Sequence, residues 1–179
     1  DFIHRGEDKI QAETARFALC TALSGRQGPV HLNLPADLVK RSVPADLVPP
    51  DRFRAGRRHF DRGAVREACR LLSRARRPAI LAGHGAYLSG AWPELRALAE
   101  RLCAPVGTTP KAKGLLPEDH PLSLGVFGFA GCPQADACFL SGEVDVLLTV
   151  GTSLGELAPH AWSPQLRPRQ ALIQVDVDP

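Results

Sequence analysis

Four short and almost uninterrupted apolar segments recur in the last two thirds of the chain, with helical patterns or a long loop between them. They are Pro78–Ala82, Pro105–Thr109, Val144–Val150 and Ala171–Val177. Strands that are apolar on both faces and separated by helices are typical of a parallel sheet covered on both sides. The sequence therefore predicts an α/β fold with three layers, in the order helix, sheet, helix.

The segments between the predicted strands have helical periodicity. Asp61 is a suitable N-cap for a helix that runs to about Arg74, and further helices are expected over Trp92–Leu102 and Pro133–Ser141. The long Gly/Pro-rich stretch 110–131 interrupts this alternation. Crossovers between the parallel strands are expected to be right-handed, and the sheet is expected to be Rossmann-like.

The first third of the chain follows a different pattern. Ile10–Ser24 is expected to be a helix, and Gly28–Pro35 a short strand bracketed by prolines. The next residues, 37–60, are rich in proline and have no clear period. We therefore predict the end of one domain in residues 1–44, a linker in 45–60 and a second domain in 61–179.

The second predicted domain has small-residue turns after three of its strands. Glycine lets a backbone approach a phosphate closely, and ligands of parallel sheets bind beyond the carboxyl ends of the strands. The candidate cofactor-binding residues are Gly83, His84, Gly85, Thr108, Thr109, Gly151, Thr152, Ser153 and Asp176. No GxGxxG or Walker motif is present. Any one of these glycine turns could instead serve tight turning alone, and Asp176 could either accept from a ribose hydroxyl or cap the next turn.

Two other chemistries are considered and set aside. Gly151–Gly155 fits the GxSxG pattern of a serine hydrolase, but such an enzyme needs an acid and a histidine later in the chain. Only His160 follows, too near to come from a separate strand. Glu118, Asp119 and His120 are consecutive, and consecutive side chains rarely converge on one ion. We therefore assign no catalytic residue and no metal site to the chain.

Charge and hydropathy limit the partners. The net charge is only +3, and the arginines at 62, 66, 70 and 74 form one exposed helical stripe without interleaved aromatic residues. We therefore expect no nucleic-acid binding. No apolar run reaches the roughly 18–20 residues that a bilayer-spanning helix needs, so we expect no membrane segment.

The five cysteines have no CxxC spacing and are odd in number, so neither a disulfide framework nor a structural zinc site is expected. Cys20, Cys69 and Cys103 lie in apolar helical patterns and are predicted to be core residues. A reducing, cytoplasmic setting fits this usage. The chain contains no methionine and begins with Asp1, which favours an internal piece of a longer protein.

Taken together, these segments resemble the thiamine-diphosphate enzymes related to acetolactate synthase, benzoylformate decarboxylase and oxalyl-CoA decarboxylase. Gly28–Leu38 resembles the end of their pyrimidine-binding domain. Arg77–Gly85, Pro105–Pro121, Asp145–Leu154 and Ile173–Pro179 resemble successive strands and turns of their central domain. The resemblance covers essentially the whole chain, in order and spacing.

The resemblance implies a parent enzyme that decarboxylates a small 2-oxo acid and works as a homodimer or homotetramer. Thiamine diphosphate and Mg²⁺ would bind in domains outside this chain, so the fragment alone is expected to be inactive. The central domain of such enzymes holds FAD, ADP, CoA or nothing. Here the Gly128–Gly131 loop and the turn at Gly151 depart from the FAD pattern. The alternative is a stand-alone Rossmann-like module that binds an adenine nucleotide without thiamine chemistry.

Overall fold

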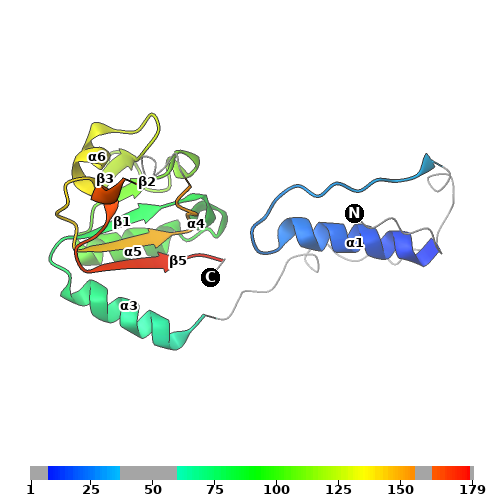
Figure 1. Ribbon diagram of the computed structural model, residues 1–179, viewed down its shortest axis with the longest axis horizontal. Coiled ribbons are helices and arrows are strands. Elements are labelled where there is room, and N and C mark those ends of the chain that lie inside the picture. The colour runs from blue at the N-terminus through cyan, green and yellow to red at the C-terminus, as the bar shows by residue number, and fades with distance from the viewer. Residues whose placement is uncertain (1–7, 37–59, 156–162, 178–179) are drawn as a thin grey trace. The chain divides into compact units, whose positions relative to one another are not determined.

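The computed structural model describes residues 8–36, 60–155 and 163–177, and the chain divides between His59 and Phe60 into two compact units (Figure 1). Residues 37–59, and with them nearly all of the predicted linker, lie outside the described residues. The boundaries 1–44, 45–60 and 61–179 therefore remain a prediction. Within the described residues, no helix has the length and apolar character needed to cross a membrane.

The first unit contains α1 (Asp8–Leu23), followed by an extended segment through Gly28–Pro35. The backbone N–H of Gly28 donates to the carbonyl of Ala22 at 3.2 Å, which closes the turn after the helix. The extended segment was expected to be a strand, but it pairs with no other strand among the described residues. Its apolar side chains at Val30 and Leu34 are exposed.

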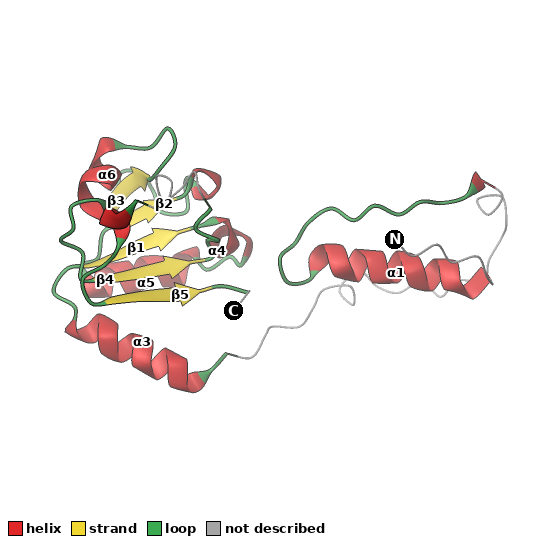
Figure 2. Ribbon diagram, viewed as in Figure 1, coloured by secondary structure: helices red, strands yellow, loops and turns green. Residues whose placement is uncertain are grey.

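The second unit is built on one five-stranded sheet in the order β3-β2-β1-β4-β5, and every neighbouring pair is parallel (Figure 2). The strands are β1 (Pro78–Ala82), β2 (Val106–Thr108), β3 (Ser123–Val126), β4 (Val146–Val150) and β5 (Ala171–Val175). The helices are α3 (Arg62–Arg74), α4 (His84–Leu88), α5 (Trp92–Leu102) and α6 (Pro133–Phe139), and the short 3₁₀ helices are η2 (Pro110–Ala112) and η3 (Pro164–Leu166). The predicted parallel α/β fold is thus confirmed.

The structure adds two elements to the prediction. β3 lies in the Gly/Pro-rich stretch that was expected to interrupt the alternation, and the short helix α4 begins immediately after Gly83. The sequence of β3, Ser-Leu-Gly-Val, has no continuous apolar run. It occupies an edge of the sheet and is only half-buried over most of its length, so it does not need one.

The two faces of the sheet form two separate cores. On one face, Ile80 and Val106 pack with side chains of α3, α4 and α5. On the other face, Leu81 and Leu147 pack with Phe127 and with α6. The alternation of side chains along each strand places neighbouring residues on opposite faces, which gives the three layers.

Helix caps follow the sequence expectations. The carboxylate of Asp61 accepts from the backbone N–H of Gly63 at 2.6 Å, as an N-cap does, and α6 starts with Pro133 in its first turn.

The predicted burial of three cysteines in the core was wrong. Cys69 and Cys103 are exposed and Cys20 is only half-buried, because α3 contacts the core mainly through Leu72, and Cys103 is the left-handed residue that ends α5.

Candidate functional site at the carboxyl edge of the sheet

The carboxyl ends of the five strands are joined by a row of backbone hydrogen bonds that continues beyond the strands. The residue after each of four strands donates its N–H to the last carbonyl of a neighbouring strand. The pairs are Phe127 to Thr108, Thr109 to Ala82, Gly83 to Val150 and Gly151 to Val175, all at 2.8–2.9 Å. This row aligns the predicted turns along one edge.

The start of α4, which follows β1, and the turn after β4 are in direct backbone contact. The N–H of Gly85 donates to the carbonyl of Gly151 at 2.8 Å. A Cβ at Gly83 would lie 2.3 Å from the Gly151 carbonyl oxygen, and a Cβ at Gly151 would lie 2.2 Å from the Ala86 nitrogen. Gly151 also has a φ of +61°, which favours glycine. The space beside these glycines is therefore filled by the chain itself.

This contact lies where ligands of parallel sheets usually bind. The strand order reverses between β1 and β4, because β2 and β3 lie on one side of β1 and β4 and β5 on the other. Such a reversal opens a crevice outside the carboxyl ends of the strands. Here the glycine contact between the chain after β1 and the chain after β4 lies at this point of reversal.

The predicted threonines lie below the exposed surface. Thr108, Thr109 and Thr152 are all buried. The Thr108 hydroxyl donates to the carbonyl of Gly125 at 3.4 Å, and the Thr152 hydroxyl accepts from the N–H of Leu154 at 3.2 Å. These side chains hold the turns in place, and their contact with a ligand stays a prediction.

Three predicted side chains are exposed at this edge: His84, Ser153 and Asp176. The Nδ1 atom of His84 lies 3.2 Å from the backbone oxygen of Lys111, and its ring stacks on Tyr87 with a centroid distance of 6.0 Å. Asp176 follows β5, and its carboxylate accepts from the N–H of Val177 at 2.7 Å. All nine predicted residues thus belong to the same edge, three as exposed groups and six as turn backbone or buried support.

In the loop after η2, the charged side chains make contacts that stabilise the fold. The ammonium of Lys113 pairs with the carboxylate of Glu118 at 3.5 Å. The His120 side chain is 9% exposed; its Nδ1 accepts from the N–H of Leu122, and its Nε2 lies 3.1 Å from a carboxylate oxygen of Glu100. This histidine therefore fastens the loop before β3 to α5.

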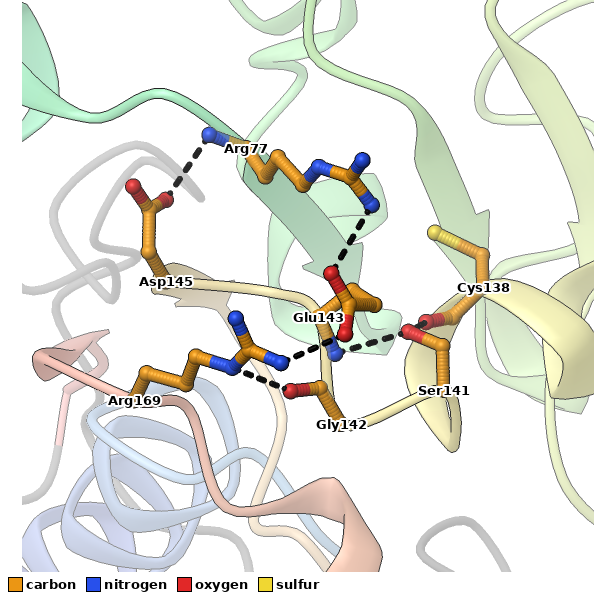
Figure 3. A network of polar contacts seen from close by, with 7 residues as sticks. All are labelled: Arg77, Cys138, Ser141, Gly142, Glu143, Asp145 and Arg169. Atoms are coloured by element: carbon orange, nitrogen blue, oxygen red, sulfur yellow. Dashed lines mark hydrogen bonds and ion pairs between the residues drawn. The ribbon is translucent and has the colours of Figure 1, made fainter.

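The opposite, amino edge holds a polar network that sequence reasoning missed (Figure 3). The buried carboxylate of Asp145 accepts from the backbone N–H groups of Arg76, Arg77 and Val146. The carboxylate of Glu143 pairs with the guanidinium groups of Arg77 and Arg169. These contacts join the starts of β1, β4 and β5. The signal in the sequence was an aspartate placed inside an apolar run.

Comparison with known proteins places the fold in a family. Residues 65–179 match the family model described as thiamine pyrophosphate enzyme, central domain. The chain belongs to this family. The predicted resemblance is thereby confirmed, and the described strands and turns of residues 65–177 are those of a thiamine pyrophosphate enzyme central domain.

Relatives of this family member include enzymes with several different names. The chain is 36% identical over 177 residues to the probable acetolactate synthase large subunit of Methanocaldococcus jannaschii, covering 93% of this chain and 29% of the relative. It is 38% identical over 156 residues to the probable 2-ketoarginine decarboxylase of Pseudomonas aeruginosa, covering 87% and 26%. It is 37% identical over 153 residues to the sulfoacetaldehyde acetyltransferase of Rhodobacter capsulatus, covering 84% and 25%. The chain thus spans less than a third of the length of these curated relatives.

Proposed function

We propose that the whole protein is a thiamine-diphosphate-dependent enzyme, most like acetolactate synthase, that decarboxylates a 2-oxo acid and protonates or ligates the resulting carbanion. The observation that carries this proposal is the family match over residues 65–179 together with relatives of that name. The cofactor supplies the electron sink, and the protein supplies placement and electrostatics. The proposal includes a homodimer or homotetramer working in the cytoplasm, a setting with which the five free thiols are compatible.

The thiamine diphosphate and Mg²⁺ are assigned to domains outside this chain. Among the residues that the structure describes, no group of three His, Cys, Asp or Glu side chains is placed to hold a metal ion. These residues therefore offer no such ligand set for the metal ion, and we derive no catalytic step through either group. This part of the protein is expected to be inactive alone.

We infer that the central domain contributes a nucleotide site at the carboxyl edge, for FAD, ADP or CoA. His84, Ser153 and Asp176 are the exposed groups that would contact the ligand. The glycines at 83, 85 and 151 and the threonines at 108, 109 and 152 would hold the turns that present them. The direct contact between the start of α4 and the turn after β4 supports this division of roles, because it leaves no phosphate-sized space between the glycines.

The proposed activity is tested with the full-length protein. CO₂ release from pyruvate and other 2-oxo acids should require both thiamine diphosphate and Mg²⁺. Full activity without thiamine diphosphate would contradict the proposal.

The nucleotide site is tested by titration calorimetry with FAD, ADP, CoA and NAD. The full-length protein should bind one of the first three, and the double change Ser153→Ala and Asp176→Asn should weaken that binding about tenfold or more. The control is Asp119→Asn, an exposed carboxylate in another loop. The 179-residue chain alone should bind weakly, since neighbouring domains would complete the site. Micromolar binding of NAD by that chain would instead favour a stand-alone nucleotide module.

A further inference from the structure

A cavity of about 460 Å³ opens at the amino edge of the sheet, on the side away from the proposed nucleotide site. Its wall is formed where α3 leads into β1, where α5 leads into β2 and where α6 leads into β4. This volume lies within the usual range of small-molecule sites. None of the residues proposed for the nucleotide site is among those that line it.

The wall of this cavity has two chemical parts. Leu102, Pro105 and Val144 give it an apolar side, and Arg76, Arg77 and the carboxylate-bearing Glu143 give it a charged side on which the cations are in excess. A ligand that matches both parts has an apolar body and one anionic end.

The two arginines are not equivalent. The guanidinium of Arg77 pairs with the carboxylate of Glu143 at 3.1 Å, and Glu143 is shared with Arg169 (Figure 3). Within the described part of the chain, no carboxylate pairs with the guanidinium of Arg76. Its backbone N–H donates to the carboxylate of Asp145 at 2.6 Å, which fixes the main chain of Arg76 at the wall of the cavity.

Arg76 is also the group that an anion would need here. The helices α5 and α6 both end at this edge, and helix C-termini carry partial negative charge that disfavours anions. A carboxylate can therefore bind only by pairing with a cation. Arginine presents a planar fork of donors that matches a carboxylate in two hydrogen bonds.

We propose that this cavity binds a small monocarboxylate with an apolar tail. The carboxylate pairs with the guanidinium of Arg76, and the tail lies against Leu102, Pro105 and Val144. The site lies at the edge of the sheet opposite to the one proposed for the nucleotide.

The cavity carries its own reporters. Cys103 and Cys138 line it, whereas Cys69 of α3 does not, and all three are free thiols. Burial raises the pKa of the Cys138 thiol, so this cysteine should be alkylated slowly and its protection should be easy to follow over time.

The experiment measures alkylation of each cysteine of the 179-residue chain by the neutral reagent iodoacetamide, read by mass spectrometry, with and without hexanoate up to about 10 mM. Hexanoate should slow the labelling of Cys138 and Cys103 at least about threefold and leave Cys69 unchanged. Hexan-1-ol, which lacks the charge, should not protect.

The change Arg76→Gln should abolish the protection by hexanoate, whereas Arg62→Gln on the exposed face of α3 should keep it. In Arg76→Gln the backbone N–H at position 76 can still donate a hydrogen bond to the carboxylate of Asp145, so the fold should persist. Circular dichroism checks that it does. Saturation-transfer NMR of hexanoate gives a second readout that does not depend on thiols. The proposal would be overturned if hexan-1-ol protected as well as hexanoate, or if hexylamine protected instead of hexanoate. It would also be overturned if hexanoate fully protected Arg76→Gln, or if neither method detected binding of hexanoate.

Discussion

The carboxylate of Asp145 accepts a hydrogen bond at 3.0 Å from the backbone N–H of Arg77, 68 positions earlier in the chain. It also accepts from Arg76 and from Val146, so one buried side chain satisfies three backbone donors at the start of β1 and β4. A buried donor without a partner costs about 1–3 kcal/mol, so the hydrogen bonds that this carboxylate accepts should stabilise the amino edge of the sheet.

Asp145→Asn should lower the free energy of unfolding by about 2–3 kcal/mol, because the amide is uncharged and places an N–H group where an acceptor is needed. Urea unfolding followed by circular dichroism measures the change. The control Asp119→Asn, at an exposed carboxylate, should stay within about 0.5 kcal/mol of the wild type. Equal stability of the two variants would show that the three hydrogen bonds contribute little.

Gly107→Ala should destabilise the domain by about 1–3 kcal/mol, because the new methyl group would lie 2.3 Å from Cε2 of Phe139. The change Phe139→Leu made in the same molecule should relieve part of this cost, and the four unfolding free energies form a double-mutant cycle. Gly155→Ala, whose Cβ meets nothing closer than 3.8 Å, is the control. Strictly additive effects in the cycle would argue against the clash.

Gly151→Ala should be more damaging, at about 3 kcal/mol or more. Alanine is disfavoured at a φ of +61°, and its Cβ would meet the backbone nitrogen of Ala86 at 2.2 Å. Because the obstacle is backbone, no rotamer change relieves it. Thermal unfolding should show the loss, and hydrogen exchange at the Gly85 amide should rise, since its bond to the Gly151 carbonyl would break. Unchanged protection of that amide would contradict the proposed contact.

Glu100 should contribute to stability in a pH-dependent way. The hydrogen bond from Arg96, and next the one with His120, hold the pKa of Glu100 below its ordinary value of 4.5. A carboxyl group with a lowered pKa in the folded state stabilises the protein above its unfolded pKa, and the contribution is lost as pH falls through the folded pKa. Glu100→Gln should therefore show a smaller decline of the urea midpoint between about pH 5 and pH 3 than the wild type. Arg96→Gln removes the hydrogen bond that lowers the pKa of Glu100 most, so it should behave similarly. If the urea midpoint of both variants fell in acid as much as that of the wild type, this role of Glu100 would be refuted.

The sequence predicted the elements that leave an uninterrupted apolar run or a clear helical period. β1 and β4 were predictable because central strands of a parallel sheet are apolar on both faces, and α3 was predictable from its cap and its period. β3 was not, since a half-buried edge strand needs no such run. The expected burial of Cys69 and Cys103 was wrong, because a helical pattern gives the side of a helix that is apolar but not how much of it the core covers.

The candidate site was only partly predictable for a similar reason. Glycines at strand ends indicated turns, and the parallel sheet brought those turns to one edge. Their spacing could not show that Gly85 and Gly151 meet each other, because the contact joins backbones 66 positions apart through a hydrogen bond that no side chain encodes. The hydrogen bonds that Asp145 accepts could not be predicted for the same reason, because two of their backbone donors lie far from it in the sequence.

The contact between the start of α4 and the turn after β4 has a consequence for how such domains diversify. The glycines hold the scaffold together, whereas His84, Ser153 and Asp176 stand on its outer rim. Substitutions on the rim can accumulate without loosening the strands beneath. Substitutions of these rim side chains can therefore change the chemistry of this edge while the backbone contacts that set its shape stay the same.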